Sequence, residues 1–265
     1  MTPPTPGTRS PGDPRDTLEA LAFAAALVTE CGDYAAEQQA GVVEHRKQHE
    51  RLSGAVVTDV DLEVERRVDA ALAERYPDDA LVGEELVDRP GRSGRTWHVD
   101  PVDGTLNFAR RLGPWSVVVS AWRGRSCELV AVRTQGVTFT AARGRGAHRD
   151  GEPLLLPVAA GEHGGLVRVP ARLAGDAAAA GWLARVVESS ATELCQVAEG
   201  RMVGTVRLSG HPRDLHGPAL LVQEAGGTVT DLAGRPWDGA STGLVAATPS
   251  AHAALLELVP PTRRG

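Results

Sequence analysis

The sequence predicts a mixed α/β protein in which an α+β half precedes an α/β half. Amphipathic helical patterns occupy residues 17–39 and the later part of residues 55–77. Apolar segments separated by glycines fill residues 115–142, which is typical of antiparallel strands. After residue 157, short apolar segments alternate with helical patterns. We therefore expect three parts, namely a disordered tail at residues 1–16, an N-terminal half at 17–156 and a C-terminal half at 157–265.

The first half should begin with a helix at residues 17–39, where Leu18, Leu21, Ala22 and Ala25 recur at helical spacing. The next segment should start as a short strand or turn and become a helix that Pro77 closes. Two short strands, "ALVGEEL" and "RTWHVD", should follow, and each ends in carboxylates.

The later elements follow from alternation and glycine positions. Antiparallel strands are expected at "WSVVVSAW", "CELVAV" and "VTFTAA", with a turn-rich exit at residues 143–152. The second half should hold helices at 177–187, 191–199, 217–225 and 250–259, and strands at "GTVRLS", "GTVTDL" and "GLVAAT". The "EAGG" at 224–227 should be a helix end whose glycines supply a left-handed cap.

Composition indicates which kinds of partner and cellular compartment suit the protein. The chain has 265 residues and a formal net charge of −6, so we expect no nucleic-acid or membrane binding, which depends on clustered lysine and arginine. Cys31, Cys127 and Cys195 lie far apart without metal-ligand spacing and should be reduced, buried thiols. No apolar run approaches the roughly 20 residues that cross a bilayer. The tail lacks an apolar signal segment, which indicates a cytoplasmic protein.

Carboxylates end four apolar segments: Asp61, Glu84 with Glu85, Asp100 with Asp103, and Asp214. Such groups would repel one another unless a cation offset their charge, and hard oxygen ligands suit Mg²⁺, which completes its shell with water and phosphate oxygens. Each carboxylate also has a structural interpretation: a first-turn helix acid at Asp61, a solvated loop at Glu84, turn chemistry at Asp100 and Asp103, and a helix N-cap at Asp214.

Four motifs occur in one order: "VTDVD" at 57–61, "GEE" at 83–85, "DPVDGTLNF" at 100–108 and "RDLHGPALLVQEAGG" at 213–227. Together they resemble the inositol monophosphatase family of magnesium-dependent, lithium-sensitive phosphatases, with VTxxD, GEE, DPxDGTxNF and WDxxxGxxxxxxEAGG. The nine-residue central motif is highly specific, and weaker similarity covers residues 17–259. The resemblance implies a layered α-β-α-β-α sandwich, two or three Mg²⁺ ions per site and a homodimer.

Carried over by position, the resemblance also implies a ligand set. Glu84, Asp100 and the backbone carbonyl of Val102 would hold a first Mg²⁺ ion. Asp100, Asp103 and Asp214 would hold a second.

The resemblance further implies catalytic and substrate-binding residues. Asp61 would lie near a third, loosely bound ion. Glu84 and Thr105 would orient the attacking water, with Thr105 as a proton relay. The amides of Gly104 and Thr105 would open a helix and bind the phosphate. Substrate contacts would come from Asp103, Gly104, Thr105, Ser189, Arg207 and Asp214.

The chain departs from the family pattern near its late motif. Arg213 replaces a tryptophan before Asp214, and Arg207 replaces a glutamate that contacts a ring hydroxyl in the inositol phosphatases. Either arginine would suit a substrate with a second anion or a carboxylate. Arg213 could instead weaken the binding of the second Mg²⁺ ion. Four further residues are expected to be solvated or structural: Lys47, His98, His211 and His216.

The expected activity is hydrolysis of a phosphate monoester, with inositol monophosphate as the family default. Histidinol phosphate, a sugar or cyclitol phosphate and a 3′-phosphonucleotide are alternatives. A non-catalytic relative that binds a phosphometabolite or a partner is a third possibility, although Glu84, Asp103 and Thr105 are all present.

Overall fold

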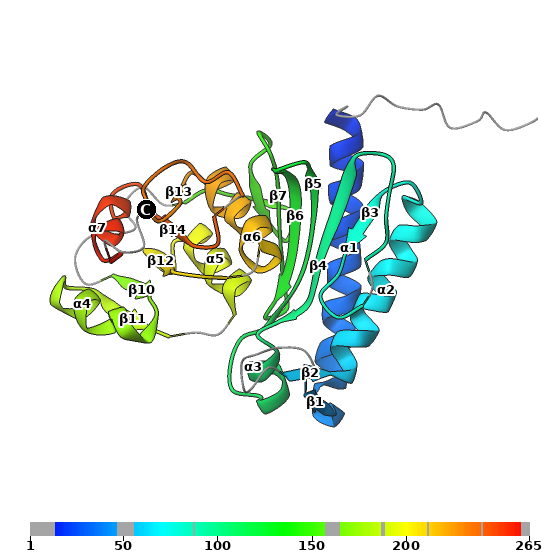
Figure 1. Cartoon of the computed structure of the whole chain (residues 1–265), viewed down its shortest axis with the longest axis horizontal. Coiled ribbons are helices and arrows are strands. Elements are labelled where there is room, and N and C mark those ends of the chain that lie inside the picture. Colours follow the sequence, from blue (N-terminus) through cyan, green and yellow to red (C-terminus); the bar gives the residue numbers. More distant parts are fainter. Residues whose placement is uncertain are drawn as a thin grey trace, which may run out of the picture.

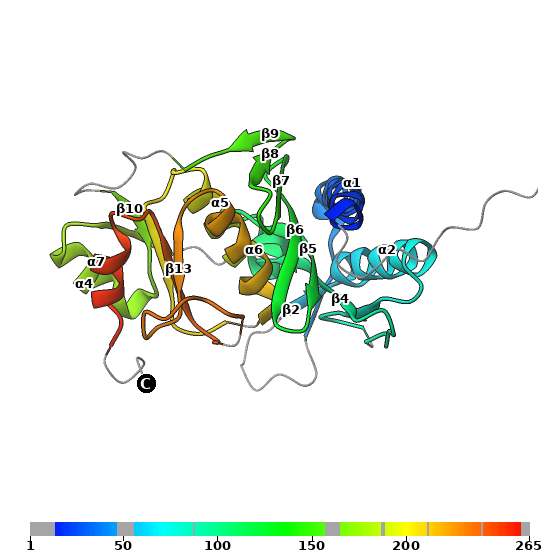
Figure 2. The same cartoon turned by 90° about the horizontal axis from the view of Figure 1, so that it is seen from above.

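The computed structural model describes residues 14–46, 56–86, 88–156, 165–186, 189–210, 212–239 and 241–260. Helices and sheets alternate in layers across the molecule (Figures 1 and 2), which confirms the predicted α-β-α-β-α sandwich. The helical layers are α1 (Pro14–Gln38) with α2 (Asp59–Arg75), α5 (Ser190–Ala198) with α6 (Pro212–Glu224), and α4 (Ala174–Ala179) with α7 (His252–Glu257).

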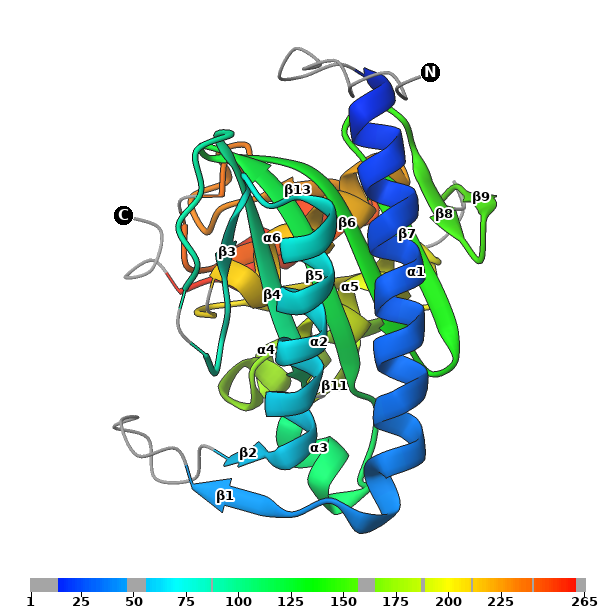
Figure 3. The same ribbon diagram turned by 90° about the vertical axis from the view of Figure 1, so that its right-hand side faces the viewer.

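The first sheet has seven strands, and α1 and α2 cover one of its faces (Figure 3). β3 and β4 run parallel, and every other neighbouring pair in this sheet is antiparallel. The strands lie in the order β3 (Ala80–Val82), β4 (Arg95–Asp103), β5 (Ser116–Arg123), β6 (Ser126–Thr134), β7 (Val137–Ala142), β8 (Ala147–Arg149) and β9 (Glu152–Leu154).

The central strands are mainly apolar because both faces of the sheet are buried. In β5, Val117 and Val119 belong to the core beneath α1 and α2, whereas Val118 belongs to the core beneath α5 and α6. Successive side chains of a strand point to opposite faces, so the continuous run "VVV" serves two cores.

The second sheet has five strands and a separate core against α4 and α7. β10 pairs in parallel with β11 and β12, while β14 is antiparallel to β12 and β13. The order is β11 (Leu183–Arg185), β10 (Leu166–Arg168), β12 (Gly204–Arg207), β14 (Leu244–Ala247) and β13 (Thr228–Thr230). Four short elements complete the fold: η1 (Gln39–Gly41), η2 (Ala171–Leu173), and the antiparallel pair β1 (Glu44–Arg46) and β2 (Val56–Thr58).

Several predicted boundaries are wrong. The helix expected at 177–187 is the short α4 followed by β11, because Gly181 turns the chain at φ 86° and Trp182 enters the core of the second sheet. α6 begins at Pro212 rather than 217 and continues through Pro218. The exit at 143–152 forms the hairpin β8–β9 instead of turns alone.

Other predictions are confirmed or only partly covered. The three cysteines are buried and unpaired with one another, as expected. α1 begins at Pro14, inside the expected tail, and residues 1–13 lie outside the described residues. In the part of the chain that the structure describes, no helix is long and apolar enough to cross a membrane.

Candidate active site

β4 ends in an irregularity that carries three predicted site residues. Asp100 pairs with Val118 and Asp103 pairs with Ser116, so the register shifts between the two aspartates. Gly104 follows with φ 92°, a left-handed conformation that glycine adopts without strain. This turn leads directly into α3 (Thr105–Arg110), which confirms that a helix opens at Thr105.

Asp61 caps the start of α2 and reaches α3. The Thr58 N–H donates to Asp61 Oδ2 at 2.9 Å, the Thr58 hydroxyl donates to the same oxygen, and the Asp61 N–H donates back to Thr58 Oγ1 at 3.3 Å. This reciprocal arrangement is a capping box. The hydroxyl of Thr105 lies 3.4 Å from Asp61 Oδ1 and 3.0 Å from the Val102 carbonyl oxygen. The fold therefore joins the first and third motifs through Asp61 and Thr105.

The charge around Asp61 is unfavourable for its ionised form. Burial raises the pKa of Asp61 to about 7, the hydrogen bonds from Thr58 lower it, and the negative charges of Glu85 and Glu84 raise it further. The carboxylates of the first two motifs therefore repel one another, as the sequence indicated. Among the described side chains, which do not include that of Asp214, no three histidine, cysteine, aspartate or glutamate side chains are placed so that they could hold a metal ion.

The "GEE" loop is organised by Glu65, a residue that motif reasoning missed. Glu65 is buried on α2, and its carboxylate accepts hydrogen bonds from the N–H groups of Glu84, Glu85 and Leu86 at 3.1, 2.8 and 2.9 Å. A Cβ atom at Gly83 would lie 1.8 Å from Glu65 Oε1, so only glycine allows this approach. The helical spacing of Asp61 and Glu65 places both on one side of α2 and could have suggested the link.

Asp103 binds the start of α5. Its carboxylate accepts hydrogen bonds from the Ser189 hydroxyl at 2.7 Å and from the N–H groups of Ser190 and Ala191 at 3.0 and 2.8 Å. Ser116 adds a hydroxyl donor at 3.1 Å. Burial raises the pKa of Asp103, and these hydrogen bonds together with the charge of Arg207 act in the opposite direction. Asp103 and Ser189, predicted from separate motifs, therefore lie in direct contact.

Arg207 is paired with a buried glutamate that the sequence analysis did not single out. Glu193 on α5 lies within 3.0 Å of Arg207 Nε, and Arg168 of β10 contacts its other carboxylate oxygen. Nothing in the local sequence links these residues, because they come from a helix and two strands.

The remaining predicted residues have mixed outcomes. His98 packs edge-on against Trp122 with ring centroids 5.7 Å apart, and this contact agrees with a structural role. The "EAGG" segment caps α6, with Gly226 at φ 97°, and the Glu224 carboxylate accepts hydrogen bonds from two backbone N–H groups. Lys47 and His211 lie outside the described residues. The backbones of three others belong to α6, but their side chains are not among those described: Arg213, Asp214 and His216.

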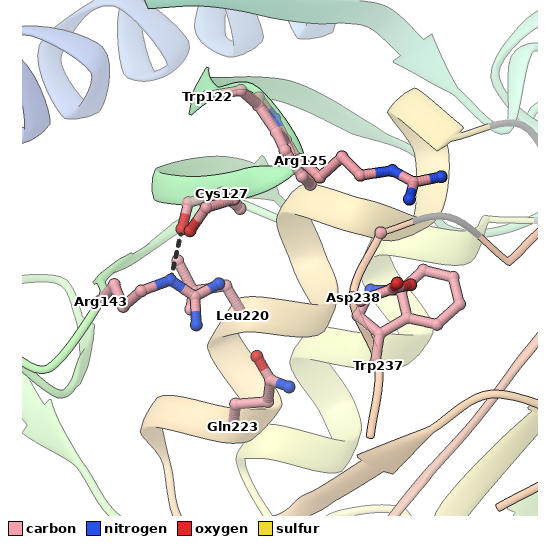
Figure 4. Close-up of a pocket in the computed structure, with 10 residues that line it drawn as sticks. Trp122, Arg125, Cys127, Arg143, Leu220, Gln223, Trp237 and Asp238 are labelled. Carbon is pink, nitrogen blue, oxygen red and sulfur yellow. Dashed lines mark hydrogen bonds between the residues drawn. The ribbon is translucent and has the colours of Figure 1, made fainter. Parts of the chain in front are cut away.

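A separate cavity of about 290 Å³ lies near Trp122 at the end of β5 and Gln223 at the end of α6 (Figure 4), whereas Asp103 lies beside Ser116 at the other end of β5. Trp122 lines it from β5, Arg125 from the β5–β6 turn, Gln223 from α6, and Trp237 from the segment after β13. The Arg143 side chain donates to the Cys127 carbonyl at 2.9 Å along its wall. The cavity shares no residue with the predicted active site.

A family model and several known proteins match most of this chain. The model of the inositol monophosphatase family matches residues 16–262. A Streptomyces griseus protein named glucose-1-phosphate thymidylyltransferase is 33% identical over 69% of this chain and 76% of its own length. A probable inositol 1-monophosphatase, ImpA, of Mycobacterium tuberculosis is 30% identical over 76% of this chain and 81% of its own.

Solved structures share the fold. The Thermotoga maritima IMPase superposes with a TM-score of 0.82 at 23% identity, covering 91% of this chain and 96% of its own. An IMPase/NADP phosphatase complexed with Mg²⁺ and phosphate superposes with a TM-score of 0.79 at 18% identity, covering 93% and 97%.

Proposed function

Because the chain belongs to the inositol monophosphatase family, we propose that it is a magnesium-dependent phosphomonoesterase that hydrolyses a small phosphorylated metabolite. The observation that carries the proposal is the junction of α2, β4 and α3, where the Thr105 hydroxyl contacts both Asp61 and the carbonyl of Val102. The charge of Glu84 reaches the same junction, since it raises the pKa of Asp61.

The possible metal ligands in this region suit a hard divalent cation. They are carboxylate and carbonyl oxygens, and the mutual repulsion around Asp61 is the kind of strain that a cation relieves. In this proposal Glu84, Asp100 and the Val102 carbonyl hold one Mg²⁺ ion, and Asp100, Asp103 and Asp214 hold a second, with Asp61 near a third. When bound, Mg²⁺ would supply neutralisation of phosphate charge and activation of water.

The protein's own groups would position the reactants and move one proton. Glu84 and Thr105 would orient the attacking water, and the Thr105 hydroxyl would pass a proton toward Asp61. The amides of Gly104 and Thr105, at the start of α3, would bind phosphate oxygens. Ser189 and Arg207 would contact the rest of the substrate.

The substrate within this class is proposed from the family. Inositol monophosphate is the default, in keeping with the name of the Mycobacterium tuberculosis relative. Histidinol phosphate, sugar or cyclitol phosphates and 3′-phosphonucleotides are alternatives. We also propose a cytoplasmic homodimer, which light scattering should show as twice the chain mass of 27.8 kDa.

Phosphate release from p-nitrophenyl phosphate and inositol 1-phosphate, with Mg²⁺ or with EDTA, tests the proposal. Asp61→Asn and Thr105→Val should each lower kcat by about 100-fold or more, because a positioned proton-transfer group contributes about 10²–10⁴ in rate. Thr96→Val, in β4 at the end remote from Asp103, is the control and should leave kcat unchanged. Absence of phosphate release at every Mg²⁺ concentration would contradict the proposal and favour a binding role.

A further inference from the structure

A chain of buried hydroxyl groups leads away from Asp103. The Ser189 hydroxyl lies 2.7 Å from Asp103 Oδ2 and 2.8 Å from the hydroxyl of Thr192, in the first turn of α5. The Thr192 hydroxyl lies 2.8 Å from that of Thr134, the last residue of β6, and Thr134 lies 2.8 Å from the Trp115 carbonyl oxygen. Ser189, Thr192 and Thr134, the hydroxyl chain, are all buried. They therefore bond to one another and to Asp103 rather than to bulk water.

The hydroxyl chain has fewer protons than hydrogen-bonding contacts. Its three hydroxyl groups carry three protons, but they take part in four contacts between the Asp103 carboxylate and the Trp115 carbonyl. The carboxylate and the carbonyl oxygens only accept hydrogen bonds, so the three protons cannot satisfy both ends at once. An ionised carboxylate is the stronger acceptor of the two. The protons of the hydroxyl chain therefore point toward an ionised Asp103, and Ser189 donates to it.

The two oxygens of the Asp103 carboxylate are held unequally. Oδ2 accepts hydrogen bonds from the Ser189 hydroxyl, from the Ser116 hydroxyl at 3.1 Å and from the Ala191 N–H at 2.8 Å. Among the described residues, Oδ1 accepts one hydrogen bond, from the Ser190 N–H at 3.0 Å. A carboxylate oxygen has two lone pairs, so the three donors saturate Oδ2 whereas Oδ1 retains acceptor capacity. Oδ1 is therefore the oxygen that Asp103 can offer to a hard cation.

We propose that Thr192 and Thr134 are positioning residues for Asp103: through Ser189 they hold its Oδ2 atom and keep Oδ1 available to a divalent cation. The inference rests on the proposed function, which assigns Asp103 to the second Mg²⁺ ion. A hydroxyl group that accepts a hydrogen bond becomes a stronger donor, so the two threonines strengthen and orient the hydrogen bond from Ser189 to Asp103. Groups that orient a metal ligand in this way contribute to the affinity for the metal.

Binding of Mn²⁺ tests this inference, because Mn²⁺ prefers the same oxygen ligands as Mg²⁺ and the free ion is measured by electron paramagnetic resonance. The full chain is titrated with Mn²⁺, and Asp103→Asn identifies which part of the binding curve belongs to the ion at Asp103. Thr192→Val keeps the shape of the side chain but removes the hydroxyl. It should raise the dissociation constant of that ion by about 10- to 100-fold, the usual effect of losing a group that orients a metal ligand. The ion assigned to Glu84 should bind as in the wild-type chain.

Further variants separate a positioning role from general destabilisation. Thr192→Ser keeps the hydroxyl and should retain the Mn²⁺ affinity of the wild-type chain. Ser189→Ala should weaken the same ion, and Thr192→Val should add nothing in that background, because Thr192 acts through Ser189. Thr134→Val, at the outer end of the hydroxyl chain, should have a smaller effect in the same direction. The matched control is Thr205→Val, which should leave Mn²⁺ binding unchanged, since the buried Thr205 hydroxyl has no hydrogen-bond partner among the described residues.

The outcomes separate this inference from the proposed function. If the wild-type chain binds Mn²⁺ and releases phosphate but Thr192→Val binds Mn²⁺ equally well, the inference is overturned and the phosphatase proposal stands. An additive loss in the double variant with Ser189→Ala, or an equal loss in Thr205→Val, also overturns it. If the wild-type chain binds no Mn²⁺, the proposed magnesium dependence fails, and the inference fails with it. Circular dichroism verifies that each variant is folded, and Thr134→Val decides the inference if Thr192→Val does not fold.

Discussion

At the residue scale, buried carboxylates organise the site by accepting hydrogen bonds from backbone N–H groups. Glu65 holds three consecutive amides of the loop that carries Glu84. Asp103 holds two amides at the start of α5. Burial removes the water that would hydrogen-bond to each carboxylate, and the backbone N–H groups replace those hydrogen bonds, which lowers the free-energy cost of burying the charge. Glu65 therefore positions the loop of Glu84, and Asp103 positions the start of α5.

Gly83→Ala should destabilise the fold and the loop. The new methyl group would collide with the Glu65 carboxylate, and overpacking of this kind costs about 1–3 kcal/mol in the free energy of unfolding. Urea denaturation measures this loss. Gly41→Ala is the matched control, because no atom lies within 4 Å of its added methyl group, and its effect should stay within about 0.5 kcal/mol. Equal stability of Gly83→Ala and the wild-type chain would refute the close approach.

At the element scale, Arg95 of β4 fastens three parts of the first half together. Its buried guanidinium pairs with Asp16 of α1, with Glu128 of β6 at 3.4 Å and with Asp79 before β3 at 3.8 Å. Asp79 in turn accepts a hydrogen bond from Trp97 Nε1 at 2.8 Å. One side chain thus fixes the start of α1 against the sheet, at the end of β4 remote from the candidate site.

Arg95→Met should lower the free energy of unfolding by about 3 kcal/mol, because it removes the buried cation that offsets the largely buried charges of Asp79 and Glu128. Arg92→Met is the control, since the pair of Arg92 with Asp78 is exposed and should contribute less than about 1 kcal/mol. Chemical denaturation of both variants provides the comparison. A loss in Arg95→Met no larger than in the control would show that the network adds little.

At the scale of the whole molecule, five layers enclose three apolar cores. The first lies between α1, α2 and the seven-stranded sheet, the second between that sheet and α5 with α6, and the third within the five-stranded sheet and its outer helices. The middle layer serves both sheets, because α6 packs on β6 and its end contacts β13. The core around α5 and α6 therefore contains side chains from both halves of the sequence.

The reactivity of the three buried cysteine thiols tests how tightly these layers pack. Burial raises the pKa of Cys31 to about 12 and also raises those of Cys127 and Cys195. Since the thiolate is the reactive form, Ellman's reagent at pH 8 should not modify the folded chain. All three thiols should react once guanidinium unfolds it. A thiol that reacts rapidly in native buffer would show that one layer opens without global unfolding.

The local patterns of the sequence were sufficient for much of this protein. Helical periodicity predicted α1 and α2, and alternating apolar residues with glycines predicted β5 to β7. The motif at 100–108 predicted the turn at Gly104 and the start of α3. Periodicity fails where elements are short, so residues 177–187 read as one helix although they divide into α4 and β11. Short elements are fixed by the core they enter rather than by their own repeat.

The sequence by itself determined the family through four motifs with short-range spacing, and the resemblance to that family implied the layered fold and the candidate site residues. Only the tertiary structure decided which of these residues meet. Asp103 contacts Ser189 across 86 residues of chain, and Glu193 of α5 pairs with Arg168 and Arg207 from two different strands. Contacts of this kind arise when separate elements pack against one another, and no local propensity encodes them.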